Sequence, residues 1–164
     1  MLELILIRHG ETEWNKKEIF RGRADVALNA AGLKQADAVA QYLSTGKINI
    51  IYSSPLKRAL KTGQAIARFQ KLNVCKAEAI TDFDYGEWQG MTLADVKEKD
   101  PLLYQDWLDT PEQLRMPGGE SLEDVSRRVI PFIDDAATCC REGKIALVSH
   151  RVVLKVIICA LLCL

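Results

Sequence analysis

The sequence predicts an α/β fold, a three-layer α/β/α arrangement around a mostly parallel central sheet. Two unbroken apolar runs, residues 4–7 and 145–148, are typical of strands that are buried on both faces. Shorter strand-like segments alternate between them with segments of helical period. If both runs are parallel strands of one sheet, their carboxyl ends meet at one edge, where open α/β sheets bind ligands.

The amino-terminal third alternates between strand and helix signals. The first strand is expected over residues 4–7, and the polar segment over 12–20 predicts an irregular stretch or a short helix. Asn29 can then cap a helix with one apolar face, which Gly46 ends. This order predicts a strand that is followed by a crossover helix.

The next strand is expected over residues 48–52, and a helix should follow it directly. Ser54 is expected to cap that helix, and Pro55 suits its first turn. Arg58 would then lie in the first turn, close to the carboxyl end of the strand.

The middle of the chain predicts a loop and a helical cover. A third short strand over residues 73–77 precedes a loop over 81–90 that is rich in Asp, Gly and aromatic residues. Thr92 and Pro101 each predict the start of a short helix. Residues around 91–116 are therefore expected to form a helical cover over the site.

The carboxyl-terminal part predicts a long helix, a strand and an apolar helix. Ser121 caps a helix from 122 to about 141, and Asp124 resembles the second half of a capping box. The fourth strand ends at His150, and an apolar helix follows from Val152.

Composition predicts a single domain over residues 1–164, large enough to build a core. Lys plus Arg and Asp plus Glu both number 22, so no net charge favours nucleic acid or an anionic membrane. Five cysteines without a Cys-x-x-Cys pair favour reduced thiols and a cytoplasmic location over disulfides or zinc. The apolar tail falls short of the roughly 20 residues that span a bilayer.

The chain has only two histidines, His9 and His150, and each follows one of the apolar runs. A neutral imidazole can attack phosphorus when cations hold the phosphoryl oxygens. Arg8, Arg58 and Arg21 are the cations expected near strand ends, and the planar guanidinium grips a phosphoryl group with two hydrogen bonds. The second histidine, when protonated, would donate to the transferring group, and a loop carboxylate would protonate the leaving oxygen.

Ordered motifs along the whole chain resemble the histidine phosphatase superfamily, in its phosphoglycerate mutase-like branch. A lone Arg-His-Gly would be a weak signal, but several motifs in the same order are a strong one. The matching segments are Leu6-Ile7-Arg8-His9-Gly10-Glu11-Thr12-Glu13-Trp14-Asn15, Gly32-Leu33-Lys34-Gln35-Ala36, Ser54-Pro55-Leu56-Lys57-Arg58-Ala59, Tyr85-Gly86-Glu87-Trp88-Gln89-Gly90, Pro117-Gly118-Gly119-Glu120-Ser121 and Val148-Ser149-His150.

The resemblance implies a phosphoglycerate mutase-like fold and a set of site residues. It implies a phosphohistidine intermediate on His9, no metal ion and no cofactor. The phosphate pocket and its surroundings would be formed by Arg8, Arg58, His150, Thr12, Asn15, Arg21 and Gly22.

Two positions depart from the family pattern. The usual proton donor is a Glu four residues before the Gly of the Gly-x-Trp motif, and Asp82 takes that place here. The acid is expected to be Asp82, with Asp84 and Glu87 as alternatives. Arg151 stands after His150 where glycine is common, and it either crowds the pocket or adds a cation to it.

The expected activity is hydrolysis of a small-molecule phosphate ester. Cofactor-dependent mutases of the family carry longer insertions that close the site, so hydrolysis is favoured over mutase-type phosphoryl transfer. A non-catalytic phosphate-binding module on the same fold is the other alternative, because Asp82, Arg151 and the carboxyl end at Leu164 are places where activity could be lost. Family members generally continue beyond the last helix, so either this protein is short or a tail is missing. A homodimer is left open.

Overall fold

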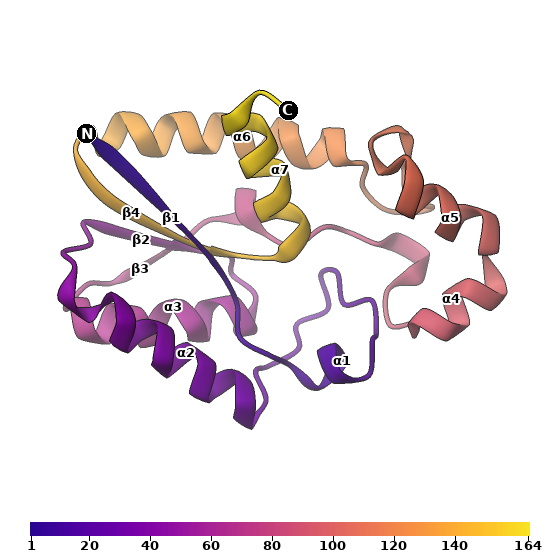
Figure 1. The fold of residues 1–164 in the computed structure, drawn as a ribbon, viewed down its shortest axis with the longest axis horizontal. Helices are drawn as coiled ribbons and strands as arrows, with labels where there is room; N and C mark the ends of the chain where they lie inside the picture. The colour runs from indigo at the N-terminus through magenta and orange to yellow at the C-terminus, as the bar shows by residue number, and fades with distance from the viewer.

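A parallel sheet of four strands lies between two layers of helices in the computed structural model, which describes residues 1–164 (Figure 1). The strands follow the order β1-β4-β2-β3, and every neighbouring pair is parallel. Their bounds are Leu2–Arg8 for β1, Ile50–Ser53 for β2, Val74–Lys76 for β3 and Gly143–Ser149 for β4. The predicted fold class is confirmed, and the first and last strands are neighbours.

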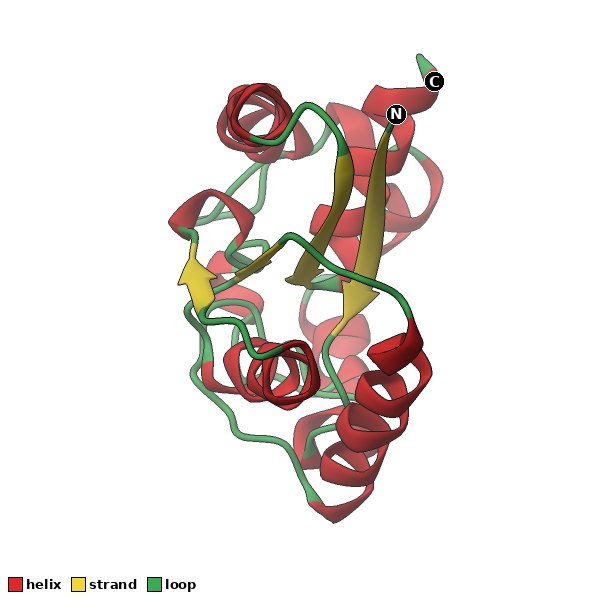
Figure 2. Ribbon diagram, turned by 90° about the vertical axis from the view of Figure 1, so that its left-hand side faces the viewer, coloured by secondary structure: helices red, strands yellow, loops and turns green.

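Helices connect the strands and cover both faces of the sheet (Figure 2). One apolar cluster joins α6 and α7 to β4, and a second joins α2 and α3 to β2 and the other face of β4. The helices are α1 (Glu13–Lys16), α2 (Ala30–Tyr42), α3 (Lys57–Gln70), α4 (Leu93–Lys99), α5 (Pro101–Asp109), α6 (Leu122–Cys139) and α7 (Arg151–Leu162). Short 3-10 turns occupy Leu43–Thr45, Glu78–Ile80, Gly86–Trp88 and Pro111–Gln113.

Three of the predicted helix caps are present. Asn29, Thr92 and Ser121 each accept a hydrogen bond from a backbone N–H in the first turn of α2, α4 and α6. Asp124 completes the capping box at Ser121, as predicted. These side chains satisfy donors that would otherwise lack a partner at the helix start.

The predicted start of α3 is wrong. The helix begins at Lys57, with Leu56 at the N-cap position and no side-chain cap. Ser54 does not cap it: its hydroxyl accepts from the Leu56 N–H at 3.3 Å, ahead of the helix, and lies 2.8 Å from Nε2 of His150. The local and the distant hydrogen bond coexist, because a hydroxyl can accept and donate at the same time.

The apolar run at the start of the chain is less buried than predicted. In β4 the five residues from Ile145 to Ser149 are buried, whereas in β1 only Ile7 is. The difference follows from position, because β1 is an edge strand whose only neighbour is β4. The side chains of β1 are therefore covered from one side only.

None of the helices is both long enough and apolar enough to cross a membrane.

Candidate active site

The carboxyl ends of β1 and β4 bring the two histidines together. The two strands pair in register, with Arg8 opposite Ser149, so the residues that follow emerge side by side. The ring centroids of His9 and His150 lie 5.1 Å apart. The backbone N–H of His9 donates to the Ser149 carbonyl at 3.1 Å. Both residues are buried, with 5% of His9 and 0% of His150 exposed. The predicted meeting of the two rings at one sheet edge is present.

His9 presents a free ring nitrogen to the site. Its Nδ1 lies 2.6 Å from the Gly10 carbonyl oxygen, and because a carbonyl only accepts, Nδ1 carries the hydrogen. Nε2 therefore keeps its lone pair, and it is buried without a hydrogen-bond partner. Burial lowers the pKa of His9 to about 3, with further lowering by His150 and Arg58 and a partial offset from Gly10 and Asp82. His9 is thus a neutral imidazole with one nitrogen free to attack.

His150 is held by Ser54, at the end of the neighbouring strand β2. Its Nε2 lies 2.8 Å from the Ser54 hydroxyl, and its Nδ1 lies 3.3 Å from Oδ2 of Asp82 without forming a well-aligned hydrogen bond. Burial, followed by the charge of Arg58, lowers the pKa of His150 well below its ordinary value. The expected imidazolium is therefore a neutral ring at neutral pH. When the Ser54 hydroxyl donates to Nε2, Nδ1 carries the hydrogen and lies on the side of Asp82.

Arg58 is fully buried, with 0% of the residue exposed. Its Nη1 donates to the Ala24 carbonyl at 2.7 Å, and its Nη2 donates to the Gly22 carbonyl at 2.7 Å and to Oδ2 of Asp82 at 2.8 Å. Gly22 adopts φ +50, a left-handed conformation that suits glycine, and its contribution to the site is this carbonyl. The Nε of Arg58 is buried without a partner, so one donor remains for a ligand.

Asp82 is the only one of the three candidate acids that contacts this group. Its second oxygen, Oδ1, accepts a hydrogen bond from the Phe83 N–H at 2.9 Å, which fixes the carboxylate over Arg58. Asp84 instead accepts from the Gly86 N–H, and Glu87 is exposed and pairs with Lys99 at 3.4 Å. Neither alternative acid touches Arg58 or a histidine.

Sequence reasoning missed two residues that hold these groups in place. Arg128, from α6, donates to the Ala79 carbonyl and to the Asp82 carbonyl, and it pairs with Glu120 at 3.0 Å. Nothing in the local pattern distinguishes Arg128 from a surface arginine of an amphipathic helix. Ser54 could have been found, because it follows a strand that ends at the same sheet edge.

The remaining predicted residues lie beside this centre. Arg8, Asn15 and Arg21 line a cavity of about 480 Å³ next to it. Thr12 is fully buried, and its hydroxyl donates to Oδ1 of Asn15 at 3.0 Å within the capping box of α1. Thr12 therefore positions Asn15, and its hydroxyl is occupied.

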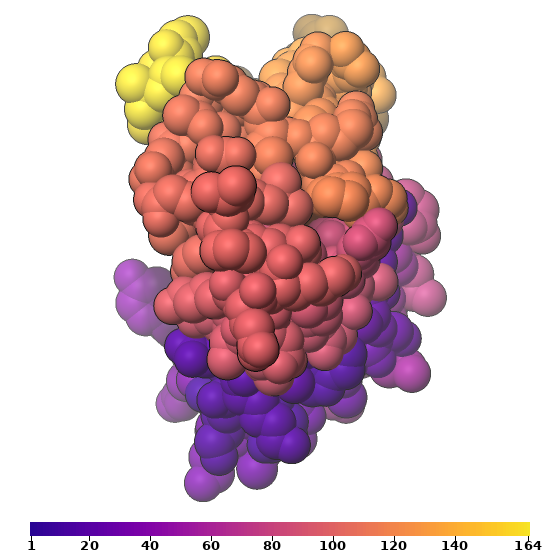
Figure 3. Space-filling view, turned by 90° about the vertical axis from the view of Figure 1, so that its right-hand side faces the viewer, coloured from indigo at the N-terminus to yellow at the C-terminus, as the bar shows by residue number.

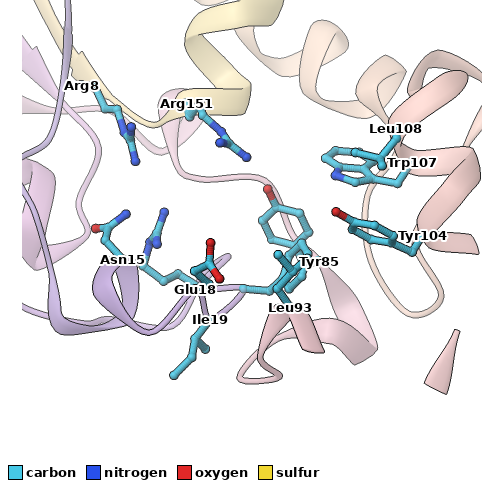
Figure 4. Close-up of a pocket in the computed structure, with 12 residues that line it drawn as sticks. Arg8, Asn15, Glu18, Ile19, Tyr85, Leu93, Tyr104, Trp107, Leu108 and Arg151 are labelled. Carbon is cyan, nitrogen blue, oxygen red and sulfur yellow. The ribbon is translucent and has the colours of Figure 1, made fainter. Parts of the chain in front are cut away.

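The helical segment over residues 91–116 forms the opposite wall of the cavity. Tyr104, Trp107 and Leu108 of α5 face Arg8 and Arg151 across the open space, with the Tyr85 hydroxyl between them (Figure 4). On the surface, the start of α4 lies directly against the amino-terminal segment, where Ile19 pairs with Thr92 (Figure 3). The cavity thus has a cationic side and an aromatic side.

Comparison with known proteins agrees with this geometry. A family model described as histidine phosphatase superfamily (branch 1) matches residues 4–164. Phosphoserine phosphatase 1 of Hydrogenobacter thermophilus is 40% identical over 162 residues, which are 99% of this chain and 77% of that protein.

Solved structures extend the similarity. A mycobacterial glucosyl-3-phosphoglycerate phosphatase in complex with VO3 superposes with a TM-score of 0.93 at 29% identity, covering 98% of this chain and 82% of that one. The alpha-ribazole phosphatase from Shigella flexneri gives a TM-score of 0.87 at 28% identity, covering 96% and 78%. These matches confirm the expected fold and family.

Proposed function

Because the chain belongs to the histidine phosphatase superfamily and is a phosphomonoester hydrolase, we propose that it acts through a phosphohistidine on His9 and needs no metal ion. The observation that carries this proposal is the His9 ring, whose buried Nε2 has no partner in the protein and whose imidazole is neutral. A nucleophile toward phosphorus needs a free lone pair and a fixed direction. His9 has both.

The phosphoryl group would bind between the two rings, against Arg58 and Arg8. Three buried nitrogens of these residues lack a hydrogen-bond partner, namely His9 Nε2, Arg58 Nε and His150 Nδ1. The Asp82 carboxylate now holds the Arg58 guanidinium, so a bound phosphoryl group would compete with Asp82 for that cation. Charge that moves onto the phosphoryl oxygens in the transition state would be stabilised by donors that have no other partner, such as Arg58 Nε.

The first step would transfer the phosphoryl group to His9. The lone pair of Nε2 forms the N–P bond, the bond from phosphorus to the ester oxygen breaks, and Asp82 gives its proton to the departing alcohol. A phosphate monoester loses its second proton only near pH 6. A substrate that binds as the monoanion can therefore give this proton to the Asp82 carboxylate, which then passes it to the departing alcohol.

The second step would regenerate the enzyme with water. Asp82, now a carboxylate, takes a proton from a water molecule, whose oxygen attacks phosphorus as the N–P bond breaks. Inorganic phosphate leaves, and His9 returns to its neutral form. The same carboxyl group thus serves as acid in one step and base in the next.

Hydrolysis of p-nitrophenyl phosphate with excess chelator tests the proposal. We expect turnover that persists with the chelator and disappears in His9→Ala, because the nucleophile is gone. Arg141→Gln is the control, since Arg141 is exposed, lies after α6 and lacks an ion pair. Acid-labile, base-stable phosphorus on the quenched wild-type protein, absent in His9→Ala, would identify the intermediate. Turnover retained by His9→Ala would contradict the proposal.

A cytoplasmic location is part of the proposal, and it is supported by five cysteines that are all free thiols. Cell fractionation followed by immunoblotting checks it. The homodimer also stays a prediction, which light scattering on the purified protein checks.

A further inference from the structure

Three arginines around the cavity have no ion-pair partner. Arg8, Arg21 and Arg151 all line the cavity, and none lies within ion-pair distance of a carboxylate. Most other arginines of the chain do form ion pairs, namely Arg23, Arg58, Arg68, Arg115, Arg127 and Arg128. Unpaired guanidinium groups are therefore concentrated at one place in this neutral protein.

These cations are close enough to affect one another. The Arg8 and Arg151 side chains extend into the same open space from the ends of adjacent elements, β1 and α7 (Figure 4). Burial lowers the pKa of Arg8, and the charge of Arg151 is the next contribution. The Nε of Arg21 is buried without any hydrogen-bond partner. The charge of Asp82 partly offsets these effects on the pKa of Arg8 and of Arg21, and an anion in the cavity would offset them further.

Apart from Asp82, whose charge acts on Arg8 and Arg21, the protein supplies little negative charge here. Glu18 is the only acidic residue that lines the cavity. The Tyr85 hydroxyl faces Arg151, but burial raises the pKa of Tyr85 to about 12, so it is an uncharged partner. Tyr85 can orient the Arg151 guanidinium and cannot neutralise it.

One phosphoryl group does not account for all of this charge. In the proposed function, the phosphoryl group binds against His9, Arg58, His150 and Arg8. Arg151 does not line the smaller recess formed by Arg8, His9 and Gly10, and it faces the larger cavity toward Trp107. The alcohol part of a bound ester would extend into that larger cavity.

We propose that Arg151 binds a second anionic group carried by the alcohol part of the substrate. The inference rests on the proposed function and adds the substrate class: phosphate esters whose alcohol bears a carboxylate or a second phosphoryl group. The planar guanidinium matches either anion with two parallel hydrogen bonds. Arg151 thereby determines specificity, while the phosphoryl chemistry belongs to the histidines.

Matched substrate pairs test this inference. O-phosphoserine and O-phosphoethanolamine differ only by a carboxylate, and fructose 1,6-bisphosphate and fructose 6-phosphate differ by a second phosphoryl group. For wild type we expect kcat/KM to favour the anionic member of one pair by roughly 10- to 100-fold, the range of a charge-assisted hydrogen bond. The pair that shows the preference identifies the second anion.

Variants at position 151 then assign the preference to one side chain. Arg151→Gln should remove most of the preference, mainly through KM, and Arg151→Lys should keep part of it because the charge remains. Arg141→Gln should keep the wild-type ratio. Circular dichroism checks that each variant is folded. The ratio of kcat/KM values for wild type tests the inference even if a variant does not fold.

Two outcomes would overturn the inference. Wild type could favour neither anionic substrate, or Arg151→Gln could reduce kcat/KM equally for both members of a pair, which would place Arg151 at the phosphoryl group. In either case, His9-dependent hydrolysis of p-nitrophenyl phosphate would leave the proposed function standing. Absence of that hydrolysis in wild type would instead contradict the proposed function.

Discussion

Each histidine of the site has one ring nitrogen fixed by a different kind of partner. A backbone carbonyl holds Nδ1 of His9, and a serine hydroxyl holds Nε2 of His150. Two buried, adjacent imidazoles cannot both be charged without a large desolvation cost, and the pKa of each is lowered. Their opposite orientations leave a lone pair on one ring and a donor on the other.

This arrangement makes stability depend on pH. The folded state keeps His9 neutral down to about pH 3, whereas the unfolded chain protonates it near 6.5. Between these values the unfolded chain binds more protons, so the free energy of unfolding falls as pH falls, by up to about 1.4 kcal/mol per pH unit and histidine. His150 adds a slope of the same sign.

Urea unfolding between pH 7.5 and 5 measures this slope. His9→Asn and His150→Asn should each show a shallower dependence than wild type, because one titrating group is lost. Carboxylates titrate in wild type and in both variants, so their contribution to the pH dependence cancels when a variant is compared with wild type. Parallel curves for wild type and both variants would show that the histidines are not held neutral by folding.

Asp82 is predicted to act as the proton donor. Asp82→Asn keeps the side-chain shape but removes the transferable proton, so esters of alkyl alcohols should slow by roughly 10²- to 10⁴-fold. p-Nitrophenyl phosphate should lose much less, because nitrophenolate leaves without a proton. Steady-state kinetics on both esters, with Asp84→Asn as the control, make the measurement. An equal loss on both esters would assign Asp82 a purely structural role at Arg58.

At the scale of elements, two glycines allow the loop that follows His9 to contact α2 closely. A Cβ on Gly32, in the first turn of α2, would collide with the Glu11 backbone, and a Cβ on Gly10 would collide with the Gly32 backbone. This close contact lets α2 begin directly beside the residue that follows His9. Backbone atoms of α2, rather than side chains, therefore support the loop that follows His9.

The apolar helix α7 should show strongly different costs at adjacent positions. Ile157 is 1% exposed in the core beneath β4, and Ile158 is 43% exposed. Ile157→Ala should lower the free energy of unfolding by about 2–5 kcal/mol, through lost burial and a cavity. Ile158→Ala should change it by about 1 kcal/mol or less. Chemical denaturation measures both, and equal losses would contradict this orientation of α7.

The elements that sequence could predict are those that local chemistry determines. Caps at Asn29, Thr92 and Ser121 need only residues within the same turn, so they could be located from the sequence. Ser54 failed as a cap because α3 begins only at Lys57, although the Ser54 hydroxyl still accepts from the Leu56 N–H. Its second partner, His150, lies far along the chain, and no local pattern contains that contact.

In the active site, too, some features could be predicted from the sequence and others could not. Two histidines after two apolar runs predicted their meeting at one sheet edge, because parallel strands align their carboxyl ends. Two other features depend on how distant segments pack. They are the hydrogen bond from Arg128 to the Asp82 carbonyl and the aromatic residues of α5 that line the cavity. The exposure of β1 likewise depends on strand order, which hydropathy does not contain.

At the scale of the whole molecule, the site joins segments from both ends of the chain, so a bound anion should stabilise the entire fold. Orthovanadate at 100 times its dissociation constant should add about 2.7 kcal/mol to the free energy of unfolding. For a chain of this size that corresponds to a rise in melting temperature of roughly 5–10 °C. Differential scanning fluorimetry measures the shift, which His9→Ala should reduce and Arg141→Gln should keep. No shift in wild type at inhibitory vanadate would contradict anion binding at this site.

Pairing of the first strand with the last also sets when the protein can mature on the ribosome. β1 is synthesised before its only partner, β4, which begins at Gly143, opposite Leu2. The nascent chain therefore carries an unpaired, largely apolar strand until β4 has been synthesised, and such a strand is prone to aggregate or to need a chaperone. A translation product that ends before β4 would lack His150 and would leave β1 unpaired, so catalytic competence requires synthesis through β4.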